Sequence, residues 1–201
     1  MTSETRALLK LLSLCLAYPA AADRAALSEM EAAAAGLGDA QARDGMARFL
    51  ALVNAQPLLK LQEHYTAVFD MNPSASLNLT WHLMGDREDR GRALADLLGV
   101  YLQAGFEPAV NELPDFLPLM LEFLAAAAPD EPHALIRRCL ATVPAIAARL
   151  RETGSPYAGP LELVCGIFPA VTEEESAGKP TGEIRNSKPE ARNKSECSKG
   201  Q

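Results

Sequence analysis

The chain has 201 residues, is 48% hydrophobic but only 5% aromatic, and carries a net charge of −7 at pH 7. The acidic balance argues against a nucleic-acid-binding protein, since such proteins usually carry a basic stripe. Lys10 interrupts the longest N-terminal apolar stretch, so no run reaches the roughly 18 residues that a transmembrane helix needs. We therefore expect no nucleic-acid partner and no stable membrane insertion.

Both the spacing of apolar residues and the composition favour helices from the first residues onward. Ala and Leu are abundant, and β-branched residues are scarce. Ser3 can act as the N-cap of a first helix, which ends before Pro19 because the residue preceding a proline is pushed out of the α region. Trp81 is expected in the core rather than as a ligand platform. Over the first half of the chain we predict helices at residues 3–17, 23–35, 40–55, 57–69 and 77–84.

The next helix has clear start and stop signals. Asp86 can cap a helix that begins at Arg87, because its carboxylate can accept the unpaired N–H groups of the first turn. Arg90 lies one turn further on and can pair with Asp86 at i, i+4 spacing. Gly105 ends the helix.

Two prolines, Pro114 and Pro118, oppose a helix in the middle of the chain unless it begins between them. We predict that Asp115 is the N-cap of a helix over residues 116–127. Pro118 then falls in the first turn, where its missing N–H removes no intrahelical bond. This helix is apolar nearly all round and should be central. A helix over 132–151, kinked at Pro144, and one over 158–168 complete the predicted domain.

The composition changes after Val171. Residues 171–201 contain no aromatic residue and hold six acidic and six basic residues, so the whole net charge of −7 belongs to residues 1–170. Such a segment buries too little apolar surface to offset its loss of conformational entropy. The sequence thus predicts an all-α fold, a single-domain helical bundle of about seven to nine helices over residues 1–170 with a disordered polar tail over residues 171–201.

The residues that could carry chemistry form no recognisable catalytic or metal-binding pattern. No histidine has a carboxylate and a nucleophile at a familiar spacing, and no glycine-rich phosphate loop is present. No CxxC pair occurs, and no cysteine has a histidine at metal-ligand spacing. We expect no enzymatic activity, no metal and no cofactor. The residues considered are His64, His82, His133, Cys15, Cys139, Cys165 and Cys197.

The cysteines also bear on the compartment. Three of the four lie within apolar helical patterns, where a reduced cysteine behaves as a small hydrophobe, so we expect a cytoplasmic protein. The start of the chain imitates a signal peptide. Glu4 and Lys10 break its basic and apolar regions, however, which favours an ordinary first helix.

The acidic residues Glu112, Asp115 and Glu122 admit two interpretations. They could be paired carboxylates for acid–base work, or Asp115 could cap a helix while Glu122 pairs with an arginine. The second is the more ordinary, and it leaves room for binding, because a cap at the rim of a groove can also face a ligand. Asp86 and Arg90 are likewise either a solvated helix start or a charged rim for a polar partner.

Five segments, in this order, resemble motifs of a known family, and their order is more specific than any one of them. They are residues 14–19 (LCLAYP), 61–70 (LQEHYTAVFD), 85–94 (GDREDRGRAL), 112–124 (ELPDFLPLMLEFL) and 155–158 (SPYA). Together they resemble the nitrate reductase molybdenum-cofactor assembly chaperones of the NarJ type, within the wider TorD-like redox-enzyme maturation chaperones. The resemblance covers about residues 8–170.

The resemblance implies a non-enzymatic, all-helical, cytoplasmic chaperone for one client. Such proteins bind the N-terminal segment of the molybdenum-containing catalytic subunit, keep it from premature membrane attachment and hold the apoenzyme open for cofactor insertion. Phe116 stands where the wider family often has a histidine, so no role for that histidine is carried over. Residues 171–201 show no counterpart of the longer C-terminal region of some members.

We expect the client peptide to bind where the helix start at Asp86 meets the segment 112–123 and the helix end at 65–69. A helical domain rich in Leu, Met and Phe can offer a trough to an amphipathic helix, and an acidic body favours a peptide with Lys or Arg. The predicted contact residues are Tyr65, Phe69, Asp86, Arg87, Arg90, Glu112, Pro114, Asp115, Leu119, Glu122 and Phe123.

Two other classes of protein fit the same residues. A structural or regulatory helical module would bury this apolar surface against a second copy of itself, whereas the chaperone is expected to be a monomer or a weak dimer. A small-molecule binder or enzyme would need a closed polar pocket. The chaperone alone should bind an isolated peptide of a redox enzyme.

Removal of the tail tests the predicted domain boundary. A chain truncated after Val171 should keep its thermal midpoint within about 3 °C, because the removed residues carry almost no apolar surface. Thermal unfolding followed by circular dichroism gives the measurement. A fall of more than about 8 °C would show that the tail stabilises the body.

Overall fold

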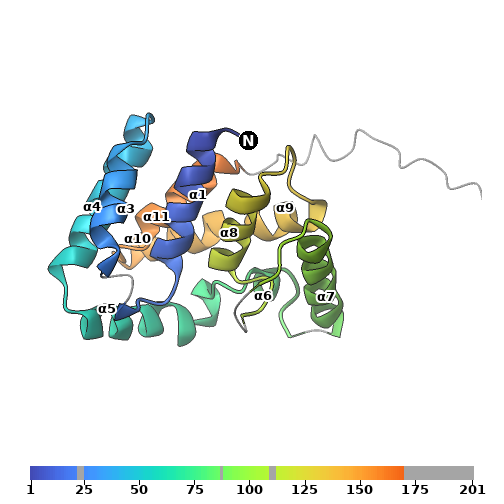
Figure 1. The fold of residues 1–201 in the computed structure, drawn as a ribbon. Coiled ribbons are helices and arrows are strands. Elements are labelled where there is room, and N and C mark those ends of the chain that lie inside the picture. The colour runs from blue at the N-terminus through green and yellow to red at the C-terminus, as the bar shows by residue number, and fades with distance from the viewer. Residues whose placement is uncertain (22–24, 87, 109–111, 170–201) are drawn as a thin grey trace, which may run out of the picture. The chain divides into compact units, whose positions relative to one another are not determined.

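The computed structural model describes residues 1–21, 25–86, 88–108 and 112–169, and the regular structure in these ranges is helical (Figure 1). The predicted all-α class is confirmed. The helices are α1 (Ser3–Leu16), α3 (Leu27–Ala35), α4 (Ala40–Ala55), α5 (Leu58–Tyr65), the π-helix η1 (Thr66–Asp70), the 3-10 helix η2 (Pro73–Ala75), α6 (Leu79–Met84), α7 (Glu88–Gln103), α8 (Leu117–Ala127), α9 (Ala134–Leu140), α10 (Val143–Glu152) and α11 (Ala158–Ile167).

Helix α8 is central, as its apolar sequence predicts, and α1 is the helix most extensively packed against it. Two hydrogen bonds fix the pair. The Ser13 hydroxyl donates to the carbonyl of Pro118 (2.8 Å), and Arg6 Nε donates to the carbonyl of Ala125 (2.8 Å). The second bond satisfies one of the carbonyls that every helix leaves unpaired in its last turn. Lys10 and Glu122 form an ion pair across the same two helices.

Helices α3 and α11 also pack against α1. Figure 1 shows α3 and α4 on one side of α1 and α8 on the other. Helix α11 packs against α10, α4 and α1, and α6 packs against α7 and α9. The buried residues from these helices form one hydrophobic core that includes Leu12 of α1, Met46 of α4 and Leu121 of α8. None of the helices within the described ranges is long and apolar enough to cross a bilayer.

Several predicted boundaries are corrected. The N-cap of α1 is Thr2 rather than Ser3, because the Thr2 hydroxyl accepts from the Thr5 N–H at 3.1 Å. The helix predicted over 132–151 is not kinked but divided. α9 ends at Leu140, and α10 starts at Val143, so Pro144 falls in a first turn, where it lacks no intrahelical bond.

The helix predicted over 57–69 changes character near its end, where α5 widens into the π-helix η1. Single π-turns of this kind are frequent at functional sites. Gly85 and Gly105 end α6 and α7 as predicted, and both adopt the positive φ that glycine tolerates best, 61° and 73°.

Three predictions concern residues outside the described ranges. These are the start of the helix predicted over 23–35, the helix start at Arg87 and the polar tail. Residues 1–170 group as one unit. The division into a chaperone domain and a disordered tail nevertheless remains a prediction.

Candidate functional site

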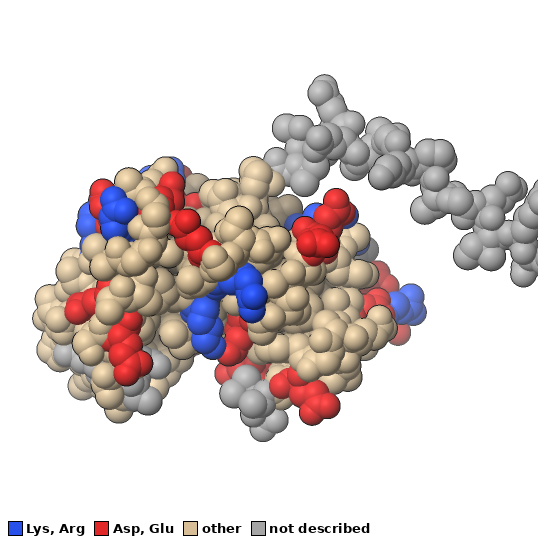
Figure 2. Space-filling model, turned by 45° about the horizontal axis from the view of Figure 1, so that its top comes forward, with Lys and Arg blue, Asp and Glu red and all other residues tan. Residues whose placement is uncertain are grey.

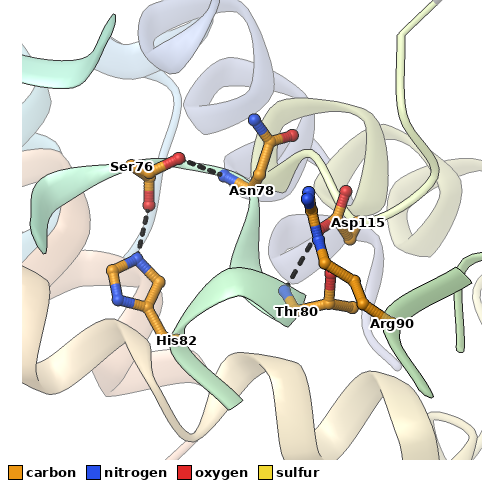
Figure 3. A network of polar contacts seen from close by, with 6 residues as sticks. All are labelled: Ser76, Asn78, Thr80, His82, Arg90 and Asp115. Atoms are coloured by element: carbon orange, nitrogen blue, oxygen red, sulfur yellow. Dashed lines mark hydrogen bonds and ion pairs between the residues drawn. The ribbon is translucent and has the colours of Figure 1, made fainter. Parts of the chain in front are cut away.

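Asp115 lies at the centre of a polar network between α6, α7 and the start of α8 (Figure 3). Its side chain is fully buried, and its Oδ2 accepts from both the backbone N–H (3.1 Å) and the hydroxyl of Thr80. Arg90 of α7 donates from Nε to the Thr80 hydroxyl (3.0 Å), and its Nη2 lies 3.7 Å from Asp115 Oδ2. Charge-assisted contacts of this kind are stronger than neutral ones.

The prediction that Asp115 caps its own helix is wrong. The N-cap of α8 is Phe116, whose side chain makes no capping bond. Asp115 instead caps α6, because Thr80 lies in the first turn of that helix. Asp115 does lie just before a helix start, as its position in the sequence indicates. Its carboxylate, however, accepts from the first turn of another helix, 35 residues away in the chain.

The backbone around Asp115 is hydrogen-bonded to the segment that leads into α6. The Leu117 N–H donates to the carbonyl of Leu77 (2.8 Å), and the Leu79 N–H donates to the carbonyl of Asp115 (3.0 Å). An isolated antiparallel β-bridge joins Asn78 to Phe116. These contacts give the Leu117 N–H, in the first turn of α8, a backbone partner, and they fix the angle between α6 and α8.

Arg90 does not make the predicted i, i+4 pair with Asp86, since its guanidinium is directed to Thr80 and Asp115. Its guanidinium carbon also lies 5.9 Å above the ring of Trp81, at cation–π distance. Trp81 is half-buried, so it belongs to the edge of this network rather than to the fully buried core. Nearby, His82 Nε2 lies 2.7 Å from the carbonyl of Ser76.

Tyr101 connects this network to α8. Its hydroxyl donates to the carbonyl of Pro114 (2.7 Å), and its ring lies 4.5 Å from that of Phe123. Burial raises the pKa of the Tyr101 phenol, and the charges of Cys139 and Asp115 raise it further. The phenol is therefore neutral and acts as a hydrogen-bond donor.

A second cluster is aromatic and gathers three of the five motifs. Tyr157 stands at its centre, 5.7 Å from Tyr65, 5.0 Å from Phe69 and 5.8 Å from the stacked ring of His64. Tyr18, half exposed, meets Tyr65 edge-on at 5.4 Å. Burial raises the pKa of the Tyr157 phenol. Tyr65 and Phe69 therefore form part of the core rather than lining an open groove.

Glu112 lies close enough to this second cluster to act on it electrostatically. Burial raises the pKa of the Tyr65 phenol, and Asp70, Tyr157 and Glu112 raise it further. The Tyr65 hydroxyl donates to the carbonyl of Leu16 at 3.0 Å, at the C-terminal end of α1.

The other predicted contact residues are dispersed. Leu119 and Phe123 are buried in the core, Pro114 is half-buried and Asp86 is exposed. Glu122 pairs with Lys10 instead of the predicted arginine. Arg87 lies outside the described residues. The eleven predicted residues therefore form two clusters and scattered surface positions rather than one trough.

The structure contains a groove that the sequence analysis missed. It lies between α4, α5 and the loop before α11, and its volume is about 510 Å³. Its lining residues are Phe49, Leu52, Val53, Gln56, Lys60, Leu61, Glu63, His64, Pro156 and Tyr157. One signal was present in the sequence. Leu52 lies off the buried stripe of α4 and Leu59 off that of α5, and the two are 50% and 64% exposed.

The metal-ligating residue types and the lining of the groove bear on the chemistry of the site. Among the described residues, no group of three or more His, Cys, Asp or Glu side chains could hold a metal ion. The groove is mainly apolar, with an ion pair between Lys60 and Glu63 (2.8 Å) at its edge. Such a surface suits an apolar side chain of a partner better than a small polar substrate.

Substitution of Asp115 tests the network. Asp115→Ala should reduce the free energy of unfolding by about 2–4 kcal/mol, because Thr80 loses its acceptor and Arg90 its counter-charge in a buried place. Asp115→Asn keeps an acceptor for Thr80 and should cost about 1–2 kcal/mol. Urea unfolding measures both, with the exposed Asp130→Asn as control. An Asn variant as stable as wild type would mean that the Arg90 contact contributes nothing.

Comparison with known proteins agrees with the five motifs. A family model described as the nitrate reductase delta subunit matches residues 14–162. The probable nitrate reductase molybdenum cofactor assembly chaperone NarJ of Bacillus subtilis is 32% identical over 175 residues, which are 87% of this chain and 95% of that protein. NarJ of Escherichia coli is 33% identical over 186 residues, 91% of this chain and 79% of that protein. The resemblance to NarJ-type chaperones is thus confirmed, and the chain belongs to the nitrate reductase delta subunit family.

Proposed function

We propose that this protein is an assembly chaperone for a molybdenum-containing nitrate reductase. The observation that carries the proposal is the extent of the similarity. The family match covers residues 14–162, which include most of the helical unit and both motif-built clusters, and the curated relatives are named as cofactor assembly chaperones. The mainly apolar groove suits the binding of a partner. We propose no enzymatic activity and no resident cofactor.

The proposed client is the N-terminal segment of the catalytic subunit, held before membrane attachment so that the molybdenum cofactor can be inserted. An amphipathic helix can lay its apolar face into a groove of a helical domain. The net charge of −7 on residues 1–170 would steer a segment that carries Lys or Arg toward the protein. The proposed setting is the cytoplasm, and the proposed state is a monomer or a weak dimer.

The predicted contact residues differ in the exposure of their side chains, and we propose different roles for the accessible and the buried ones. Asp86 and Glu112 are exposed, and Arg90, Pro114 and Glu122 are half-buried, so these five can touch a peptide. Buried Tyr65, Phe69, Asp115, Leu119 and Phe123 would act through the shape of the surface. Figure 2 shows one face of the molecule, with Asp and Glu scattered over it and Lys and Arg gathered mainly near its centre.

Peptide binding tests the proposal directly. A synthetic peptide of the N-terminal segment of the nitrate reductase catalytic subunit encoded in the same genome should bind with a Kd of about 1 μM or somewhat tighter, because ordering the peptide offsets part of the gain. Isothermal titration calorimetry measures the affinity, and a scrambled peptide of equal charge is the control. Absence of heat at tens of micromolar, with a folded protein, would remove the N-terminal segment as the client.

A charge reversal separates steering from contact. Asp86→Lys should slow association of the same peptide about three- to tenfold at low salt, and the difference should shrink at about 300 mM salt. Asp130→Lys changes the net charge equally at an exposed position on another loop and should have less than a twofold effect. Stopped-flow fluorescence provides the rates. Equal slowing by both variants would assign the effect to the charge of the whole body.

A further inference from the structure

We propose that the groove between α4 and α5, rather than the eleven contact residues predicted from the sequence, receives the apolar side chains of the client helix. The inference rests on the proposed function and locates its site. The occupant is one helical segment of net positive charge with apolar residues spaced i, i+3 or i+4 apart. None of the eleven residues predicted from the motifs lines this groove.

The volume and lining of the groove fit this occupant. A volume of about 510 Å³ lies within the range of roughly 300–1,000 Å³ that is usual for binding pockets. Phe49 and Val53 of α4 contribute to one side, Leu61 of α5 to another, and Pro156 and Tyr157 come from the loop before α11. Three separate segments of the chain thus surround one largely apolar space.

The groove wall is already ordered before any partner arrives. Tyr157 is only 2% exposed and its ring packs against Phe49 at 5.4 Å. The ring of His64 stacks on Tyr157, and its Nε2 lies within hydrogen-bond distance of the Ser155 hydroxyl at 3.1 Å. Because these side chains are held by one another, binding would not need to order them, and less of the interaction energy is lost to conformational entropy.

A second, smaller cavity adjoins the groove. Its volume is about 40 Å³, and it shares Phe49, Val53, Leu61 and Tyr157 with the groove lining. Its remaining lining is apolar and includes Leu27 and Met30 of α3. The shared residues are therefore part of a larger apolar region than the groove alone.

An exposed leucine extends the apolar surface of the groove. Leu52 lines the groove and is 50% exposed. Removing such a side chain from water is favourable, because the hydrophobic free energy scales with the apolar area that is buried. A partner helix in the groove would cover Leu52.

Charge selects this occupant over two others. A second copy of the chain would bring another body of charge −7 against the first, which electrostatic repulsion disfavours, whereas a cationic segment is attracted. The protein's own residues 171–201 contain only Val171 and Ile184 as large aliphatic residues and no aromatic residue. They therefore lack the repeated apolar anchors that a helix in a groove requires.

A pair of matched substitutions tests the assignment. Leu52→Glu and Leu102→Glu each replace a leucine that is 50% exposed, one at the groove and one on α7, and both change the net charge equally. The probe is the synthetic N-terminal peptide of the nitrate reductase catalytic subunit encoded in the same genome. We expect Leu52→Glu to weaken its binding at least tenfold and Leu102→Glu to change it less than twofold. Leu52→Ala, which adds no charge, should weaken binding two- to fivefold.

On the same samples, circular dichroism shows whether each variant is folded, and sedimentation velocity shows whether it is a monomer or a dimer. Tight peptide binding that both glutamate variants retain would overturn the groove assignment and leave the proposed function standing. Equal weakening by both variants would also overturn it, because the effect would then come from net charge. Wild-type protein that fails to bind the peptide would overturn the proposed function and the groove with it. A dimer of wild type that only Leu52→Glu dissociates would make the groove an interface between copies instead.

Discussion

The burial of α8 is the constraint on which the rest of the structure depends. Eight of its eleven residues are buried, so this helix needs neighbours on nearly every side and backbone partners at both ends. α1 supplies the largest of these contacts, and its Arg6 binds the carbonyl of Ala125 near the C-terminal end. At the N-terminal end the carbonyl of Leu77 accepts from the Leu117 N–H. Once α8 is fixed in this way, the positions of α1 and of the segment that leads into α6 follow.

The polar network around Asp115 extends the same frame to α6 and α7. A buried carboxylate is costly unless it is paired and hydrogen-bonded, and here Thr80 and Arg90 provide those contacts. The aromatic cluster around Tyr157 holds other helices together in the same way. It joins the end of α1, α5 and the start of α11. The side chains that carry the family resemblance are thus mostly those that set the relative positions of helices.

The helices were largely predictable because each has an apolar stripe and local end signals, and these depend only on neighbours in the chain. Asp115 shows where that information ends. Its position before a helix predicts a cap, but the N–H it serves belongs to Thr80, and nothing local encodes a partner so far away in the chain. Tyr65 and Phe69 were assigned to a groove because aromatic residues suit both cores and interfaces. Only the packing of Tyr157 against both rings shows that they belong to the core. The α4–α5 groove depends on the loop before α11, so a leucine off the buried stripe of α4, Leu52, was the signal that a single segment could give.

A chaperone that prepares an enzyme for a cofactor must release it afterwards, and the surfaces described here suit moderate binding. The groove is ordered in advance, which lowers the cost of binding on the protein's side. The client segment still has to become helical, and that ordering consumes part of the interaction energy. The ion pair at the edge of the groove, Lys60 with Glu63, is exposed, and exposed pairs contribute little to stability. Acidic residues spread over the body speed the encounter without adding strong contacts that would slow departure. Under the proposed function, a small apolar groove on a negatively charged helical frame would therefore favour rapid capture with limited residence.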